Sequence, residues 1–287
     1  MPRIAYVNGR YAPLAEAAVH VEDRGFQFAD GVYEVWAVMG GKLADAEGHF
    51  ARLSRSLGEL GIREPMSRAA LTQVLRETIR RNRLRDGLVY LQVTRGAARR
   101  DHAFPPPETQ PTVVITARPV DLEALDRKAA AGTTVITQPD IRWGRCDIKT
   151  VGLLPNALAK QAAKAAGAGE AWLVDAEGYV TEGSSTNAWI VDHEGRLRTR
   201  DVGANILRGV TRLGLIEIAR ECQLEVVEAP FTLAEAKAAK EAFFTAASAF
   251  VTPVTAIDGE VVGDGRPGPV TLRLRDLYTR RAREGAL

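Results

Sequence analysis

Short runs in which apolar and polar residues alternate predict β-strands with one buried face. The strongest run is 31–39, and a chain turn at Gly40-Gly41 follows it. On one face of this run lie Val32, Glu34, Trp36 and Val38. The other runs expected as strands are 4–7, 42–44, 88–94, 111–118, 133–137, 171–174, 179–182, 187–191, 225–228, 243–247 and 254–257.

Apolar residues that recur every three or four positions predict helices between these strands. The expected helices are 46–60, 67–84, 155–167, 211–222, 232–240 and 269–283. For the helix 155–167 and its approach, the expected buried side consists of Leu154, Leu158, Ala162 and Ala165. Mixed strands and helices of this kind are typical of an α+β protein.

The length of 287 residues suits two domains. A charged segment that follows a proline and lacks a strand pattern is expected as a linker at 121–128. This predicts a small N-terminal α/β domain, 1–120, and a larger C-terminal domain, 129–287.

The composition excludes several function classes. The net charge is +2, so no overall field recruits nucleic acid or a membrane surface. Two cysteines make no disulfide framework, four histidines lack the paired spacing of a metal site, and no apolar run approaches membrane-spanning length. We therefore expect a cytoplasmic protein without a metal site.

One of the seven lysines, Lys149, lies in unusual surroundings. It stands between the apolar residues Trp143 and Ile148 and the apolar run that starts at Val151. A lysine in such surroundings loses hydration, which favours the neutral amine, and a neutral amine can form a Schiff base with an aldehyde cofactor. The alternative is a lysine that merely closes a strand end.

Glu182 lies in the segment VTEGSSTN, where many small donors surround its carboxylate. It is either the polar end of a hairpin or the partner of a basic ring nitrogen in a cofactor. Three further candidates have equally plain alternatives. Arg52 could bind a phosphate or be an ordinary surface arginine. Arg100 and His102 could bind a carboxylate together or merely lie at the tip of an exposed loop. Gly209-Val210-Thr211 could bind a phosphate at a helix N-terminus or be a helix start without a ligand.

Seven motifs occur in the order in which one family has them: DRGFQFADGVYE (23–34), HFARL (49–53), VTRGAARRDHAFP (93–105), RCDIK (145–149), LLPNALAKQ (153–161), VTEGSSTN (180–187) and ILRGVTR (206–212). With them the chain resembles the class IV aminotransferases, the fold type IV enzymes that use pyridoxal 5′-phosphate (PLP). Among these it is most similar to the bacterial D-amino acid aminotransferases. The resemblance implies a C-terminal pseudo-barrel domain and a homodimer whose active site is shared across the interface.

The resemblance also implies roles for individual residues. Lys149 would carry PLP and move the substrate proton, and Glu182 would face the pyridine nitrogen. Tyr33, Arg100 and His102 would bind the α-carboxylate of a D-amino acid donor, and the acceptor would be a 2-oxo acid such as 2-oxoglutarate or pyruvate. The other cofactor contacts would be Arg52, Leu207, Val210, Thr211 and Ser248.

One position departs from the family pattern. Relatives often carry Ser and Thr after the strand near Thr245, where this chain has Ala246-Ala247 and only Ser248 is polar. We expect somewhat weaker retention of PLP for this reason.

Alternative activities on the same fold are a branched-chain L-amino acid or (R)-amine aminotransferase and 4-amino-4-deoxychorismate lyase. A carrier of PLP without activity is a further alternative. The Arg-x-His pair in the loop at 100–102 argues against the first two, because a carboxylate clamp at this place is typical of the D-amino acid enzymes.

Overall fold

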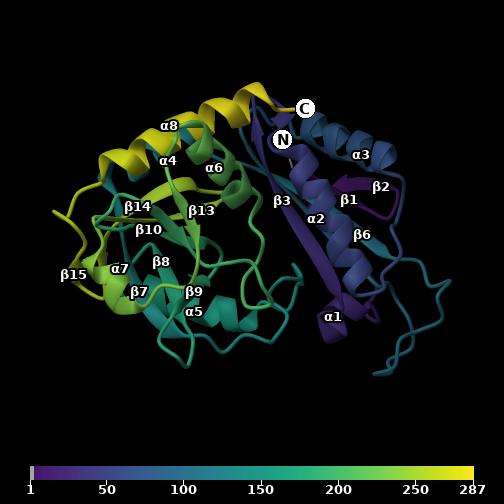
Figure 1. Cartoon of the computed structure of the whole chain (residues 1–287). Helices are drawn as coiled ribbons and strands as arrows, with labels where there is room; N and C mark the ends of the chain where they lie inside the picture. The colour runs from purple at the N-terminus through teal and green to yellow at the C-terminus, as the bar shows by residue number, and fades with distance from the viewer. Residues whose placement is uncertain (1–2) are drawn as a thin grey trace. The chain divides into compact units, whose positions relative to one another are not determined.

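The computed structural model describes residues 3–287 and divides the chain into two compact units (Figure 1). The first unit contains the chain up to Asp121 together with Ile148–Gly152 and Ala282–Leu287. The second contains Leu122–Asp147 and Leu153–Arg281. The short segment with Lys149 therefore belongs to the first unit, although its neighbours in sequence belong to the second.

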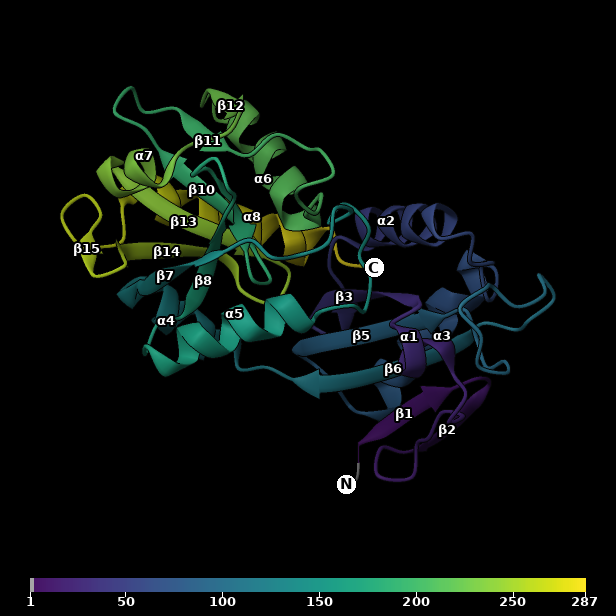
Figure 2. The same cartoon turned by 90° about the horizontal axis from the view of Figure 1, so that it is seen from below.

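The first unit is a six-stranded antiparallel sheet with two long helices. The strand order is β2-β1-β6-β5-β3-β4. Figure 2 shows the long strands β3, β5 and β6 side by side. The elements are β1 (Ile4–Val7), β2 (Arg10–Pro13), β3 (Gly31–Met39), β4 (Lys42–Leu43), β5 (Gly87–Thr94), β6 (Thr112–Pro119), α1 (Arg24–Phe28), α2 (Ala46–Glu59) and α3 (Arg68–Arg81).

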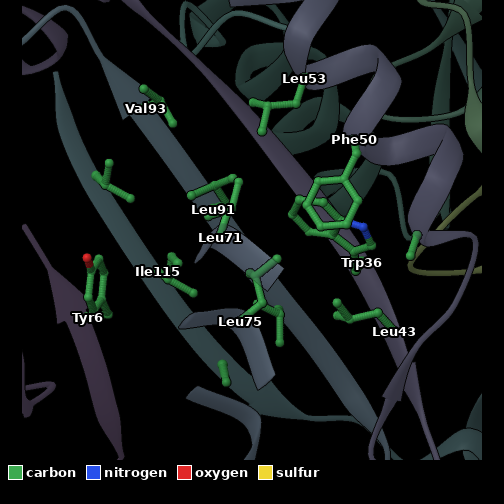
Figure 3. Packing of buried hydrophobic residues seen from close by; sticks show 14 of the residues in the cluster. Tyr6, Trp36, Leu43, Phe50, Leu53, Leu71, Leu75, Leu91, Val93 and Ile115 are labelled. Carbon is green, nitrogen blue, oxygen red and sulfur yellow. The ribbon is translucent and has the colours of Figure 1, made fainter. Parts of the chain in front are cut away.

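Helices α2 and α3 bury their apolar sides against this sheet (Figure 3). Phe50 of α2 lies 5.4 Å from Trp36 of β3, measured between ring centroids. Leu71 and Leu75 of α3 belong to the same core as Leu91 of β5. The predicted face of β3 is confirmed, because all four of its members have no exposed surface. One of those four is Glu34, a charged side chain in an apolar core.

Two segments outside the predicted helices and strands are helical. Residues 24–28 form α1, which the Asp23 carboxylate caps by accepting a hydrogen bond from the Gly25 N–H group. Most of the expected linker, 121–128, lies in helix α4 (Leu122–Ala131). Helices this short bury few apolar residues, so neither leaves a clear periodic pattern in the sequence.

The second unit contains a nine-stranded mixed sheet. Its main path runs β12-β11-β10-β13-β14-β7-β8-β9, and β15 pairs with β14. Strand β7 runs parallel to both β8 and β14. The strands are β7 (Thr133–Pro139), β8 (Glu170–Val174), β9 (Val180–Gly183), β10 (Asn187–Val191), β11 (Leu197–Thr199), β12 (Val226–Glu228), β13 (Glu241–Ala246), β14 (Phe250–Ile257) and β15 (Glu260–Val261).

This sheet curls, because β9 at one end of the path also packs beside β10 in its middle. Figure 1 shows the strands turned around a common interior. An apolar core that includes Trp172, Phe231 and Phe244 fills the curl. The helices of this unit, besides α4, are α5 (Leu154–Ala165), α6 (Val210–Glu221), α7 (Leu233–Ala238) and α8 (Pro269–Glu284), of which the last three residues belong to the first unit.

The expected buried side of α5 is wrong. Ala159 and Ala163 face the core, whereas Leu154 and Leu158 are 71% and 56% exposed. The alanines let the helix lie close to Ala171 of β8. The leucines and the alanines both recur at helical spacing, so periodicity alone cannot choose between the two faces. None of the helices among residues 3–287 is long and apolar enough to cross a membrane.

Candidate active site

Lys149 and Tyr33 lie together in the first unit. The backbone around Lys149 pairs with the start of β3, where the Tyr33 N–H group donates to the Lys149 carbonyl at 3.0 Å and the Val151 N–H group to the Gly31 carbonyl at 3.0 Å. This pairing holds the Lys149 ammonium nitrogen over the Tyr33 ring, 4.1 Å from its centroid. The structure thus brings together the predicted catalytic lysine and one predicted substrate residue.

The apolar surroundings expected for Lys149 are only partly present. Ile148 is buried, but Trp143 and Leu153 are 46% and 37% exposed, and Lys149 itself is half-buried. The aromatic ring of Tyr33, rather than the apolar sequence neighbours, provides the closest described environment of the amine.

Arg52 is held by a buried carboxylate. It projects from α2 with 10% of its side chain exposed. Its Nε donates to Glu34 Oε1 at 2.7 Å, and its Nη2 donates to Glu34 Oε2 at 2.8 Å. His49, one turn earlier in α2, places Nδ1 2.7 Å from the same carboxylate. The two-point contact fixes the plane of the guanidinium.

The pKa values of this cluster follow from its burial and charges. Burial alone would raise the pKa of Glu34, but the charge of Arg52 and the hydrogen bonds of Arg52 and His49 outweigh it and lower the pKa to about 2. Burial lowers the pKa of His49, so its imidazole is neutral at neutral pH. The positive charge of Arg52 is therefore balanced by the negative charge of Glu34.

Arg100 and His102 converge on one ring, as their spacing predicts. The guanidinium carbon of Arg100 lies 5.0 Å from the centroid of the Phe28 ring, and the His102 ring lies 5.5 Å from the same ring. Both side chains are exposed, and within residues 3–287 neither has a hydrogen-bond partner. Their polar atoms are therefore available to a ligand.

No described contact within residues 3–287 joins this pair directly to Tyr33. The described contacts of the Tyr33 side chain are with Lys149 and with the Tyr90 ring at 5.6 Å. Those of Arg100 and His102 are with Phe28. The three predicted carboxylate contacts thus belong to two sets of side-chain contacts, one around Tyr33 and one around Phe28.

In the second unit, several donors surround the carboxylate of Glu182. The Asn187 Nδ2 group donates to Oε2 at 2.9 Å, and the Leu207 N–H group lies within 3.2 Å of both oxygens. Asn187 also donates to the Leu207 carbonyl at 2.9 Å. The predicted neighbours Glu182 and Leu207 are therefore brought together, with Asn187 between them.

Arg142 is a partner of Glu182 that the sequence did not reveal. Its Nη1 donates to Glu182 Oε1, while its Nε and Nη2 donate to the Asp140 carboxylate at 2.9 and 2.6 Å. Burial would lower the pKa of Arg142, but Asp140 and Glu182 outweigh it and raise the pKa further above its ordinary value. The charge of Arg142 stabilises a negative charge on Glu182.

The N-terminus of α6 has no side-chain cap. Gly209 is the cap residue, and a side chain there would collide with Asn187 Oδ1 at 2.0 Å. The backbone N–H groups of Val210 and Thr211 therefore lie at the positive end of a long helix, a favourable place for an anion.

Ser248 lies exposed in the turn between β13 and β14. Among residues 3–287 no cluster of three or more His, Cys, Asp or Glu side chains is placed to hold a metal ion.

Comparison with known proteins identifies the family of this chain. The family model for amino-transferase class IV matches residues 31–257. The chain belongs to the class IV aminotransferases. Its sequence is 41% identical over 264 residues to a D-alanine aminotransferase of Bacillus licheniformis, and the match covers 92% of each chain. A D-alanine aminotransferase of Staphylococcus haemolyticus is 39% identical, with 96% of each chain covered.

Solved structures of the family have the same fold. A branched-chain amino acid aminotransferase of Escherichia coli matches with a TM-score of 0.89 at 25% identity, covering 98% of this chain and 95% of the other. The branched-chain amino acid aminotransferase of T.th. in complex with N-(5′-phosphopyridoxyl)-L-glutamate matches with a TM-score of 0.87 at 30% identity, over 99% and 95%. The predicted α+β fold of two domains with a curled C-terminal sheet is confirmed as that of a class IV aminotransferase.

Three residues of this aminotransferase were not singled out as site residues from sequence alone. They are Glu34 and His49 beside Arg52, and Arg142 beside Glu182. The sequence did contain a signal for Glu34, since a carboxylate on the apolar face of β3 needs a cationic partner. No comparable signal marked Arg142, because arginine is common in surface loops.

Proposed function

We propose that this class IV aminotransferase is a PLP-dependent transaminase of D-amino acids. It would move the amino group of a donor such as D-alanine to a 2-oxo acid such as 2-oxoglutarate or pyruvate. The observation that carries the substrate class is the convergence of Arg100 and His102 on the Phe28 ring. Both side chains are exposed, and neither has a hydrogen-bond partner in the part of the chain that the structure describes. Their donors suit a carboxylate, and the relatives named D-alanine aminotransferase point to the same substrate.

The residues of each unit suggest particular contacts with the cofactor. In the first unit, Lys149 would hold its aldehyde carbon covalently and Arg52 would bind its phosphate. In the second unit, Glu182 would pair with the ring nitrogen, and the phosphate would also meet the α6 N-terminus. The remaining contacts in the second unit would be Leu207, Val210, Thr211 and Ser248.

The chemical fit of these residues supports the cofactor. Within residues 3–287 no hydrogen bond or ion pair occupies the Lys149 Nζ, whose described contact is the Tyr33 ring. Arg52 presents a guanidinium whose plane is fixed by Glu34, and the start of α6 has no cap of its own. The carboxylate of Glu182 is buried, 6% exposed, and is held in place by Asn187 and Leu207.

Bound PLP supplies an electron sink for the negative charge that develops at the substrate Cα. Lys149 Nζ would move the proton from this Cα to the C4′ position of the cofactor and back. It is the candidate base because covalent attachment already places it within reach. Glu182, as an anion, would hold a proton on the ring nitrogen. Arg142 binds the same Glu182 carboxylate that would pair with the ring nitrogen. Asp140 provides a second negative charge beside Arg142, so the Arg142 charge is shared between two carboxylates.

The substrate carboxylate would be bound by Tyr33 together with Arg100 and His102. We propose a homodimer in which the loop of one subunit completes the site of the other, since no described contact within residues 3–287 joins Arg100 and His102 to Tyr33. Large exposed apolar side chains support an interface, among them Val21, Phe26, Phe104 and Leu154 at 73%, 76%, 67% and 71% exposure. A cytoplasmic location stays a prediction from the sequence.

A half-reaction tests the substrate class. The PLP-loaded protein is mixed with D-alanine, L-leucine or (R)-1-phenylethylamine, without an acceptor, and the cofactor absorbance is followed. Rapid conversion to the pyridoxamine form by D-alanine alone is the expected result. Conversion by L-leucine or the amine, with D-alanine inert, would overturn the proposal.

The principal competing function is a branched-chain L-amino acid aminotransferase. The fold similarity to the solved branched-chain enzymes favours it. The sequence identity to them, 25% and 30%, is lower than the 41% shared with the Bacillus licheniformis protein. The L-leucine arm of the half-reaction separates the two activities. Release of pyruvate from 4-amino-4-deoxychorismate without an acceptor would instead indicate a lyase.

A further inference from the structure

Arg24 is buried beneath the loop that carries Arg100 and His102. Only 3% of its side chain is exposed. Its Nη1 donates to the backbone carbonyl of Asp101 at 2.6 Å and to that of Ala103 at 3.3 Å. These two residues flank His102, so one guanidinium nitrogen holds the loop backbone on both sides of the histidine.

The guanidinium of Arg24 is itself held by a carboxylate. Its Nε donates to Asp30 Oδ2 at 2.7 Å. Asp30 also accepts from Arg95, whose Nε and Nη2 lie 2.8 and 3.0 Å from its two oxygens. All three side chains are at most 9% exposed. The arrangement is a buried Arg–Asp–Arg triad rather than a surface ion pair.

The triad connects the loop to the helix that carries Arg52. Arg95 donates to the carbonyls of Leu60 and Gly61, at 2.8 and 3.1 Å, directly after the end of α2. The two arginines carry two positive charges and Asp30 only one negative charge. Four backbone carbonyls, two in the loop and two after α2, accept the remaining hydrogen bonds of the guanidinium groups. The loop is therefore anchored to the body of the first unit.

Phe28 provides the platform for the side chains of the same loop. It lies in α1, four residues after Arg24, so both project from the same side of this short helix. The Arg24 guanidinium carbon is 4.7 Å from the centroid of the Phe28 ring. On that ring also lie Arg100 and His102. Arg24 therefore orients the loop backbone, and Phe28 orients the two side chains.

We propose that Arg24 is a positioning residue for substrate binding, which acts through Arg100 and His102 with Phe28 as its platform. The inference rests on the proposed function, because it assumes that this pair binds the substrate carboxylate. Arginine is required because its planar fork serves Asp30 and two carbonyls at once, whereas the single ammonium of a lysine cannot span them.

The test uses the PLP-loaded enzyme with Arg24→Lys and the matched control Arg99→Lys, an exposed arginine of the same loop. The rate of the half-reaction is measured at increasing concentrations of D-alanine. This gives two separate quantities, the half-saturating D-alanine concentration and the rate at saturation. A displaced clamp should raise the half-saturating D-alanine concentration by up to about 100-fold. The saturated rate and the affinity for PLP should change little, and the control should resemble the parent enzyme.

A double-variant cycle distinguishes positioning from a general structural role. If Arg24 acts through Arg100, Arg24→Lys should add little to the loss already caused by Arg100→Ala. Fully additive losses, or an Arg24→Lys enzyme with an unchanged half-saturating concentration, would overturn the inference. Phe28→Leu leaves the triad intact and should give the same type of loss, so the inference stays testable if Arg24→Lys folds poorly. A normal response of Phe28→Leu would then overturn it.

The same experiment separates this inference from the proposed function. If the parent enzyme does not convert D-alanine, the proposed function fails and the inference fails with it. If Arg100→Ala binds and converts D-alanine normally, the carboxylate clamp and the positioning role are wrong, whereas the D-amino acid activity stands. If Arg100→Ala is impaired while Arg24→Lys and Phe28→Leu are normal, the proposed function stands and only the positioning role is wrong.

Discussion

Replacing Glu34 by glutamine should strongly destabilise the first unit. The Glu34 carboxylate has no exposed surface and is held by Arg52 and His49. Its pKa is lowered from 4.5 to about 2 in spite of burial. A shift of this size corresponds to roughly 3 kcal/mol, and breaking a buried ion pair costs about 3–5 kcal/mol. We therefore expect Glu34→Gln to lower the free energy of unfolding by about 3 kcal/mol at pH 7.

The pH dependence follows from the direction of the shift. A carboxylate whose pKa is lowered on folding stabilises the protein at pH values above its unfolded pKa, and this stability is lost as the pH falls through the folded pKa. For Glu34 the loss should begin below pH 4.5 and continue toward pH 2. The difference between the parent protein and Glu34→Gln should therefore shrink over this range.

Glu77→Gln is the matched control. Hydrogen bonds from Arg80 and Arg81 also lower the pKa of Glu77 to about 2, but this carboxylate lies at the surface of α3. Surface ion pairs contribute little because solvent screens them. Glu77→Gln should therefore have a small effect on stability.

Hydrogen exchange measured by mass spectrometry on peptides from β3 and α2 would report the stability of the first unit by itself. Equal destabilisation by Glu34→Gln and Glu77→Gln, or a difference that stays constant below pH 4.5, would refute the reasoning.

Three further outcomes are expected. Lys149→Ala should abolish multiple turnover, and near-normal rates would contradict its catalytic role. Ala247→Thr should slow the loss of PLP on dialysis by adding a hydroxyl after β13, whereas equal retention would refute this prediction. Gly96→Ala should destabilise the first unit by more than about 1 kcal/mol, since Gly96 has φ +104° and a methyl group would lie 2.0 Å from the Gln110 carbonyl oxygen. Gly144→Ala, with open space around it, is the control in thermal unfolding.

Much of the first unit was predictable because its signals are local. The alternation in 31–39 determines which side chains share a face of β3, and that face is buried in the structure. The two-residue spacing of Arg100 and His102 likewise placed both on one side of an extended loop. The segment around Lys149 was distinctive in the sequence because its motifs occur together in one family.

The orientation of α5 could not be predicted, because its leucines and its alanines both follow helical spacing. The alanines are buried since they allow close approach to β8, and this preference exists only once the strand is in place. The same reasoning applies to α1 and α4, whose short lengths leave little periodicity to detect.

The partners of the charged site residues were decided by tertiary structure alone. Arg24 meets the carbonyl of Asp101, 77 residues away, and Arg142 meets Glu182, 40 residues away. Sequence by itself determined which residue types were available, their local conformation and the family to which they belong. The topology of the two sheets determined which of them meet, because a hydrogen bond needs contact within about 3 Å and local periodicity carries no information about distant segments.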